Sequence, residues 1–136
     1  VWRIDVPKLG SDQAFRSYKI SKRFDQDISA VMSAFNLTLE DRTVKSARIA
    51  FGGMAATPRR AAKAEQALVG ASLEDSASWN AGIAALGSDF QPISDMRASA
   101  AYRLDVAQGL LRKALIEIAG AGTDQTRIVG VRRVVA

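Results

Sequence analysis

Two periodic patterns of apolar residues follow one another along this chain, and their order restricts the folds that it can adopt. Between Asp27 and Phe51, apolar residues recur at near-alternating positions, as they do in β-strands. Between Leu73 and Ile118, they recur three and four residues apart, as on one face of a helix. Strands that precede helices predict an α+β fold, in which a small antiparallel sheet carries helices on one face.

The strand region predicts a β-hairpin. Its first strand begins at Asp27, residues 40–42 form a polar turn, and the second strand runs from Val44 to Phe51. The first strand has apolar residues on both faces, with Ile28, Ala30, Met32 and Ala34 on one and Val31, Phe35, Leu37 and Leu39 on the other. After the second strand, the pair Gly52-Gly53 predicts a sharp bend where two backbone segments approach closely.

Two helices are predicted after the strands. Ser72 and Asp75 form a variant of the capping box, which predicts a helix from Leu73 to about Leu86, ended by Gly87. A longer amphipathic helix is predicted over residues 99–118, ended by the glycines at 120 and 122. The remaining residues form a basic, valine-rich tail with no evident partner within the chain.

Three segments have less certain patterns. Residues 1–15 are expected to be extended or loop-like, and Arg16 to Arg23 to form a short helix or an ordered loop. Pro58 to Val69 is rich in alanine, which favours a helix. The same stretch also alternates, with Arg59, Lys63 and Glu65 opposite the alanines, which is compatible with a strand.

The composition excludes several kinds of active site. The 136 residues fit one domain, and the chain has neither cysteine nor histidine. Disulfides, thiolate nucleophiles, cysteine or histidine metal sites and imidazole bases are therefore excluded, and we assign no catalytic and no metal-binding residue. No stretch is apolar enough to cross a membrane, and the composition is compatible with a cytoplasmic location. Because the chain begins at Val1 rather than Met, we expect it to be a piece of a longer protein.

The net charge of +5 allows a second class of function. A basic domain can bind nucleic acid or an acidic protein surface, so a small basic binding module is an alternative. The lysines and arginines are scattered, however, and are not interleaved with aromatic residues, which favours an ordinary solvated surface. A homodimer formed through an exposed sheet face is a further alternative.

The segment from Tyr18 to Ile28 concentrates charge just before the predicted hairpin. Lys19, Lys22 and Arg23 lie within five residues. Lys19 or Arg23 could face an anionic or electron-rich ligand, because a lysine can hydrogen-bond a ring carbonyl and a cation beside a flavin favours its anionic reduced form. Alternatively, Arg23 pairs locally with Asp27 on the surface.

The segment from Ser94 to Arg103 also has two interpretations. It could be a loop that contacts a partner, or a cap before the last helix with Asp95 pairing with Arg97 or Arg103.

Three stretches together resemble one family. They are Tyr18–Val31, Ile49–Pro58 and Ser94–Arg103, which resemble, in order and separation, the C-terminal domain of the FAD-binding subunit of molybdenum hydroxylases. The chain is most similar to the small subunit of bacterial xanthine dehydrogenases and more distantly to the carbon monoxide dehydrogenase flavoprotein. The resemblance covers residues 1–119 and leaves 120–136 as a tail outside it.

The resemblance implies a three-stranded antiparallel sheet packed against a three-helix bundle. In that arrangement, residues 58–69 become the third strand and residues 16–23 the first helix.

The resemblance also implies a function. Such a domain covers the FAD held by other domains of the FAD and iron–sulfur subunit, and packs against the molybdenum-binding subunit, with no nucleic acid and no membrane as partner. Lys19 and Arg23 fall where the family contacts the flavin. The molybdenum cofactor and iron–sulfur clusters lie elsewhere in such enzymes, so the chain alone is expected to be inactive as an oxidoreductase.

Overall fold

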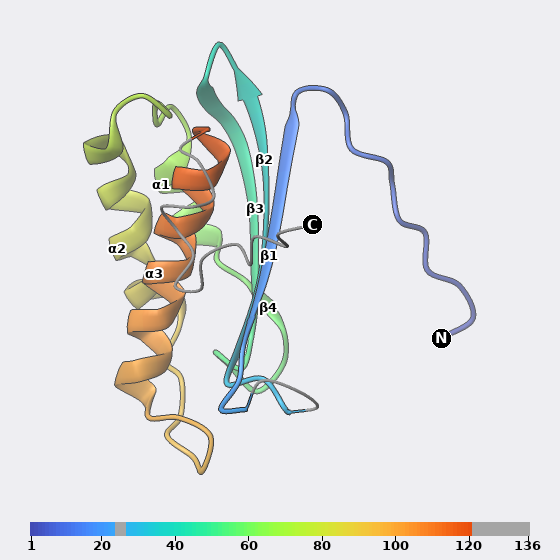
Figure 1. The fold of residues 1–136 in the computed structure, drawn as a ribbon, viewed down its shortest axis with the longest axis vertical. Helices are drawn as coiled ribbons and strands as arrows, with labels where there is room; N and C mark the ends of the chain where they lie inside the picture. Colours follow the sequence, from blue (N-terminus) through green and yellow to red (C-terminus); the bar gives the residue numbers. More distant parts are fainter. Residues whose placement is uncertain (24–26, 121–136) are drawn as a thin grey trace, which may run out of the picture.

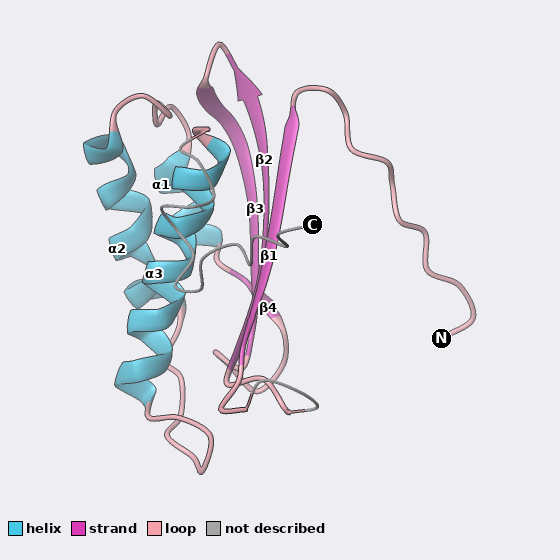
Figure 2. Ribbon diagram, viewed as in Figure 1, coloured by secondary structure: helices cyan, strands magenta, loops and turns pink. Residues whose placement is uncertain are grey.

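A four-stranded antiparallel sheet carries three helices on one of its faces (Figures 1 and 2). The computed structural model describes residues 1–23 and 27–120. The strands lie in the order β1-β2-β3-β4, with bounds β1 Gln13–Ile20, β2 Val31–Glu40, β3 Thr43–Gly52 and β4 Arg59–Arg60. The helices are α1 Ala62–Leu68, α2 Asn80–Asp89 and α3 Ala100–Ile118, and a 3₁₀ turn, Ser76–Trp79, precedes α2. The predicted α+β class is confirmed. The sheet has four strands rather than the three expected, because β1 was not predicted as a strand.

The predicted hairpin is confirmed as β2 and β3, although β2 begins at Val31 rather than at Asp27. Phe35 lies opposite Ile49 in the antiparallel register. Asp41 and Arg42 both have positive φ, 47° and 60°, which matches the tight turns whose twist suits adjacent strands.

One face of the hairpin is buried beneath the helices. Phe35, Leu37 and Phe51 are almost fully buried there, and edge-to-face ring contacts link Phe35 to Phe51 and Phe51 to Phe90. Met32, from the opposite face of β2, remains exposed. The sheet therefore has one covered face and one open face, although the sequence has apolar residues on both.

The predicted first helix at residues 16–23 is wrong, because β1 occupies most of this stretch and pairs along its whole length with β2. Alternation explains the outcome. Tyr18 and Ile20 pack against the core, whereas Phe15 and Lys19 lie on the open face.

The predicted third strand at residues 58–69 is also wrong. Only Arg59 and Arg60 pair with β3, and α1 follows directly, as the alanine content of this segment favours. The buried carboxylate of Glu65 fixes α1 against the sheet, since it accepts a hydrogen bond from the Ile49 N–H at 2.8 Å and pairs with Arg60 at 2.6 Å.

The predicted bounds agree with the structure for the last helix but not for the helix before it. The helix predicted from residue 73 begins later, because Asp75 caps the 3₁₀ turn through the Ala77 N–H, and α2 then runs past Gly87 to Asp89. The last helix is confirmed as α3, with Ser99 as its cap. Gly120 follows it with a φ of +91°, whereas the expected role of Gly122 and the tail lies outside the described residues.

Within the part of the chain that the structure describes, none of the helices has the length and apolar character that a membrane span requires.

Candidate functional site

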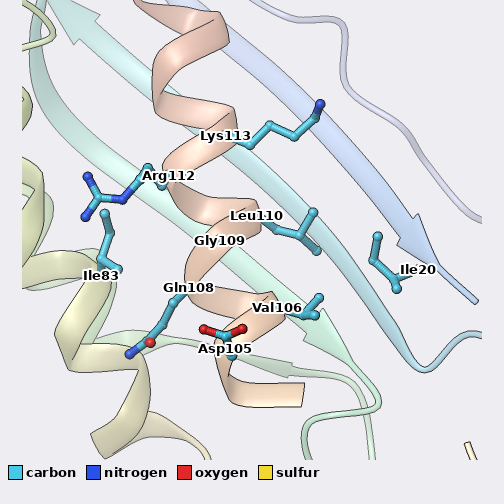
Figure 3. Close-up of a pocket in the computed structure, with 9 residues that line it drawn as sticks. All are labelled: Ile20, Ile83, Asp105, Val106, Gln108, Gly109, Leu110, Arg112 and Lys113. Atoms are coloured by element: carbon cyan, nitrogen blue, oxygen red, sulfur yellow. The ribbon is translucent and has the colours of Figure 1, made fainter. Parts of the chain in front are cut away.

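A hollow with a volume of about 510 Å³ lies on the outer side of α3 (Figure 3). Gly109 leaves its centre open, and the charged residues on its wall are Asp105, Arg112 and Lys113. These charges are mixed and do not converge on one point. Within the described residues, no group of acidic side chains could hold a metal ion.

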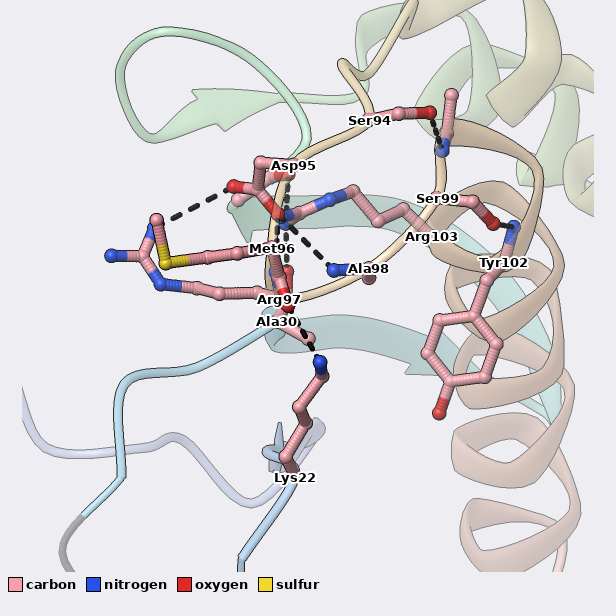
Figure 4. A network of polar contacts seen from close by, with 12 residues as sticks. Lys22, Ala30, Ser94, Asp95, Met96, Arg97, Ala98, Ser99, Tyr102 and Arg103 are labelled. Atoms are coloured by element: carbon pink, nitrogen blue, oxygen red, sulfur yellow. Dashed lines mark hydrogen bonds and ion pairs between the residues drawn. The ribbon is translucent and has the colours of Figure 1, made fainter.

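A second site lies at the N-terminal end of α3, where one buried arginine joins three distant segments (Figure 4). Only 2% of Arg103 is exposed. Its Nη1 donates to the carbonyl oxygens of Ala30 and Gly53, the latter at 2.9 Å, and its Nη2 donates to Asp95 Oδ1 at 2.6 Å. These bonds connect the three stretches that the sequence singled out. We refer to Ala30, Gly53, Asp95 and Arg103 as the junction.

Gly53 provides the close approach that the junction requires. It has a φ of +80°, and a Cβ at this position would lie 2.4 Å from the Ala30 carbonyl oxygen. Only glycine satisfies both conditions without displacing the backbone. The predicted bend after the second strand is therefore confirmed.

Asp95 organises the loop before α3. Its Oδ1 accepts hydrogen bonds from the N–H groups of Arg97 at 2.8 Å and Ala98 at 3.1 Å. These two bonds, with the Arg103 guanidinium, lower the pKa of Asp95 to about 2. The carboxylate also pairs with Arg97 at 3.6 Å, so both of the ion pairs considered from the sequence are present.

A lysine ties this loop to the end of β1. Lys22 Nζ donates to the Met96 carbonyl oxygen at 2.5 Å (Figure 4). The loop is thus held from one side by Arg103 and from the other by Lys22.

A cavity of about 350 Å³ opens beside the junction. Two cations, one phenol and small or apolar groups line it: Ile20, Ser21, Lys22, Ala30, Arg97, Ala98, Ser99 and Tyr102. No carboxylate is among them. Such a lining suits a ligand that combines an apolar or aromatic body with anionic or carbonyl oxygens.

The structure brings the two predicted site residues to the same end of the sheet. Lys19 and Arg23 both line a shallow hollow of about 430 Å³, together with Ile20, Ser21 and Lys22. Lys19 lies on the open face of the sheet. Arg23 pairs with Asp27 at 3.5 Å, as its alternative interpretation predicted. Because Lys22 lines this hollow and the cavity beside the junction, the two spaces are neighbours.

Sequence reasoning missed the central role of Arg103, which it treated only as a possible partner of Asp95. A signal was present, since Arg103 precedes Ala107, Leu110 and Ala114 on the stripe that α3 buries. An arginine in an apolar stripe must find buried acceptors, which marks it as a candidate for a structural or functional network.

Comparison with known proteins gives one family and several relatives. A sequence model described as "CO dehydrogenase flavoprotein C-terminal domain" matches residues 16–118. The nicotinate hydroxylase hnxS of Emericella nidulans is 38% identical over 109 residues, which are 76% of this chain and 8% of that protein. The xanthine dehydrogenase of the same organism is 30% identical over 129 residues, 89% of this chain and 10% of that protein.

Solved structures show the same fold. CO dehydrogenase from Oligotropha carboxidovorans superposes with a TM-score of 0.74 at 26% identity, over 86% of this chain and 40% of that one. CO dehydrogenase from Hydrogenophaga pseudoflava gives a TM-score of 0.72 at 26% identity, over 81% and 38%. The chain thus spans well under half of each of these relatives.

Proposed function

Because the chain belongs to the CO dehydrogenase flavoprotein C-terminal domain family, we propose that it covers the flavin of a molybdenum hydroxylase. It would be the C-terminal domain of the FAD-binding subunit, with the FAD held mainly by other domains of that subunit. The molybdenum cofactor and the iron–sulfur clusters would belong to other domains or subunits against which this domain packs.

The observation that carries the proposal is the pair of neighbouring hollows lined by cations and by no carboxylate. Ammonium and guanidinium donors match the phosphate and ring carbonyl oxygens of FAD, and the apolar side chains of Ile20 and Ala30 in the lining match an aromatic ring. The residues therefore fit the cofactor. FAD, when bound, supplies the capacity to take up electrons from one centre and pass them to an acceptor.

Individual residues take distinct roles in this proposal. Lys19 presents a positive charge and hydrogen-bond donors to the flavin, and Arg23 adds a second positive charge at the rim. Lys22 and Arg103 hold the loop over residues 94–99 in place, so that this loop excludes water from the site.

Among possible substrates, we propose a purine, as in xanthine dehydrogenases, with NAD as the acceptor and a cytoplasmic location. The relative at 30% identity that carries this name supports the proposal, whereas the relative at 38% identity is a nicotinate hydroxylase. Turnover assays of the complete enzyme with xanthine and with nicotinate distinguish the two. Turnover of nicotinate alone would replace the purine in this proposal.

The role of Lys19 is tested in the full-length enzyme with Lys19→Gln. The loss of one charge-assisted hydrogen bond, worth about 1.5 kcal/mol, is expected to weaken FAD retention about tenfold. Titration of the flavin-free enzyme with FAD measures this, together with the flavin reduction potential. Lys45→Gln, a lysine on β3 near the β2–β3 turn, is the matched control. Unchanged affinity and unchanged potential in Lys19→Gln would contradict the assignment.

The chain alone is expected not to retain FAD, because its hollows form only part of a site. Flavin titration of the purified chain measures this directly. Tight, stoichiometric uptake would show instead that these residues form a complete site.

A further inference from the structure

The first nine residues expose five large apolar side chains. Trp2 is 94%, Ile4 76% and Val6 84% exposed, and Val1 and Leu9 are also exposed. Single exposed apolar residues are ordinary on a protein surface, but a cluster of this density marks a contact site.

The segment has the two faces of a β-strand. Trp2, Ile4 and Val6 alternate with Arg3 and Asp5, and Arg3 Nε donates to Asp5 Oδ1 at 2.7 Å. This ion pair between residues two apart puts both charges on one side, as in extended backbone, and the apolar side chains on the other. Pro7 lacks an N–H and so limits the strand at its C-terminal end.

Nothing in the described part of the chain covers this apolar face. The segment runs away from the sheet (Figure 1), and its hydrogen bonds are the Arg3–Asp5 pair and those that join Gly10 to Gln13. β1, an edge strand, lies close by in the sequence, but residues 1–9 do not pair with it.

We propose that residues 2–6 add as a strand to the edge of a sheet in another domain of the same polypeptide, with Trp2, Ile4 and Val6 packed into that domain. Two observations favour this partner over a second copy of the chain. The family match begins only at residue 16, so the segment lies outside the pattern of its own domain. The solved relatives also have about 60% of their length outside the region that this chain matches. The proposal does not depend on flavin binding.

The test compares amide hydrogen exchange of residues 2–6 in the full-length protein and in the 136-residue chain. Strand addition predicts slow exchange in the full-length protein and rates of an unstructured peptide in the chain alone. Unprotected amides in both would overturn the proposal. Slow exchange of these amides in the chain alone would also overturn the proposal. If that protection is independent of protein concentration, the segment pairs with β1 of its own chain. If it increases with concentration, the segment pairs with a second copy.

Two variants of the full-length protein test which face of the segment over residues 2–6 is packed against the other domain. Ile4→Ser removes an apolar group from the packed face and is expected to accelerate exchange of this segment at least tenfold. Arg3→Ser changes the opposite face of the same strand and is expected to leave exchange nearly unchanged. Equal acceleration by both variants would overturn the two-faced arrangement.

Discussion

Alanine substitutions at Gly53 and Gly70 measure how much the close backbone approach at the junction contributes to stability. Both glycines have positive φ, +80° and +84°, but only at Gly53 would a Cβ meet other atoms, first the Ala30 carbonyl oxygen and then Arg103 Nη1. Gly70→Ala is expected to lower the free energy of unfolding by about 1 kcal/mol through backbone strain alone. Gly53→Ala adds the collision, and a total loss of about 3 kcal/mol is expected from urea unfolding. Equal losses would show that the Ala30 backbone moves aside freely.

Asp95 gives the junction a defined acid sensitivity. Its pKa falls from 3.8 to about 2 on folding, mainly through the N–H groups of Arg97 and Ala98. A lowered folded pKa stabilises the protein above the unfolded pKa, and this contribution disappears as pH falls from 3.8 towards 2.

Unfolding experiments with Asp95→Asn between pH 7 and pH 2 test this. The difference in unfolding free energy between the wild type and Asp95→Asn is therefore expected to shrink over roughly the pH interval from 4 to 2. Asp105→Asn, which removes an exposed carboxylate from α3, controls for the change in net charge. A difference that stays constant down to pH 2 would show that the carboxylate charge is not what stabilises the loop.

The residues of the site differ in how far the sequence could reveal them. Lys19 and Arg23 were chosen from a local charge cluster and a family resemblance, and the structure brings both to one hollow. The acceptors of Arg103 at Ala30 and Gly53 lie 73 and 50 residues away along the chain. No local pattern specifies such partners, because they depend on how the sheet and α3 come together.

The helices and strands that were predicted correctly have strong signals within a single segment. The hairpin of β2 and β3 combines alternation with a polar turn, and α3 combines a cap, a long apolar stripe and a terminal glycine. The helix expected over residues 16–23 came from the family resemblance. The alternation of β1 is also irregular, because Arg16 lies on the same side as Tyr18 and Ile20, where it pairs with Glu117, and Phe15 lies on the open face. The helical propensity of α1 was correct, and the three-stranded arrangement expected from the family resemblance misplaced it.

Two glycines within helices allow the effect of helix packing on stability to be distinguished from the effect of helix propensity. A Cβ on Gly82 of α2 would lie 2.4 Å from Leu68 Cγ of α1, whereas a Cβ on Gly109 of α3 would meet nothing within 4 Å. Gly109→Ala is expected to stabilise the chain by about 0.5–1 kcal/mol. Gly82→Ala is expected to destabilise it by about 1–3 kcal/mol, because α1 and α2 must separate. Thermal or urea unfolding measures both. A stabilising Gly82→Ala would mean that the two helices adjust without cost.

The whole molecule consists of a packed body and an N-terminal segment that contributes little to it. Deleting residues 1–8 is expected to change the free energy of unfolding by less than about 0.5 kcal/mol, because their side chains are exposed. A deletion that extends through Asp12 also removes the carbonyl that accepts from the Leu39 N–H at 2.8 Å, and is expected to cost about 1 kcal/mol more. Urea unfolding of both truncations checks this. A large loss of unfolding free energy from the shorter deletion would show that residues 1–8 pack against the rest of the domain.

The positions of the groups that Arg103 bonds determine at which stage of folding the junction can form. Two of its acceptors, Ala30 just before β2 and Gly53 in the bend after β3, are far from it in sequence, so these two bonds can close only after the hairpin has formed and α3 has docked. The cavity beside the junction is lined by residues of the same segments, so it is complete only when the hairpin and α3 have come together. Under the proposed function, a flavin that depends on this cavity would bind only the folded domain.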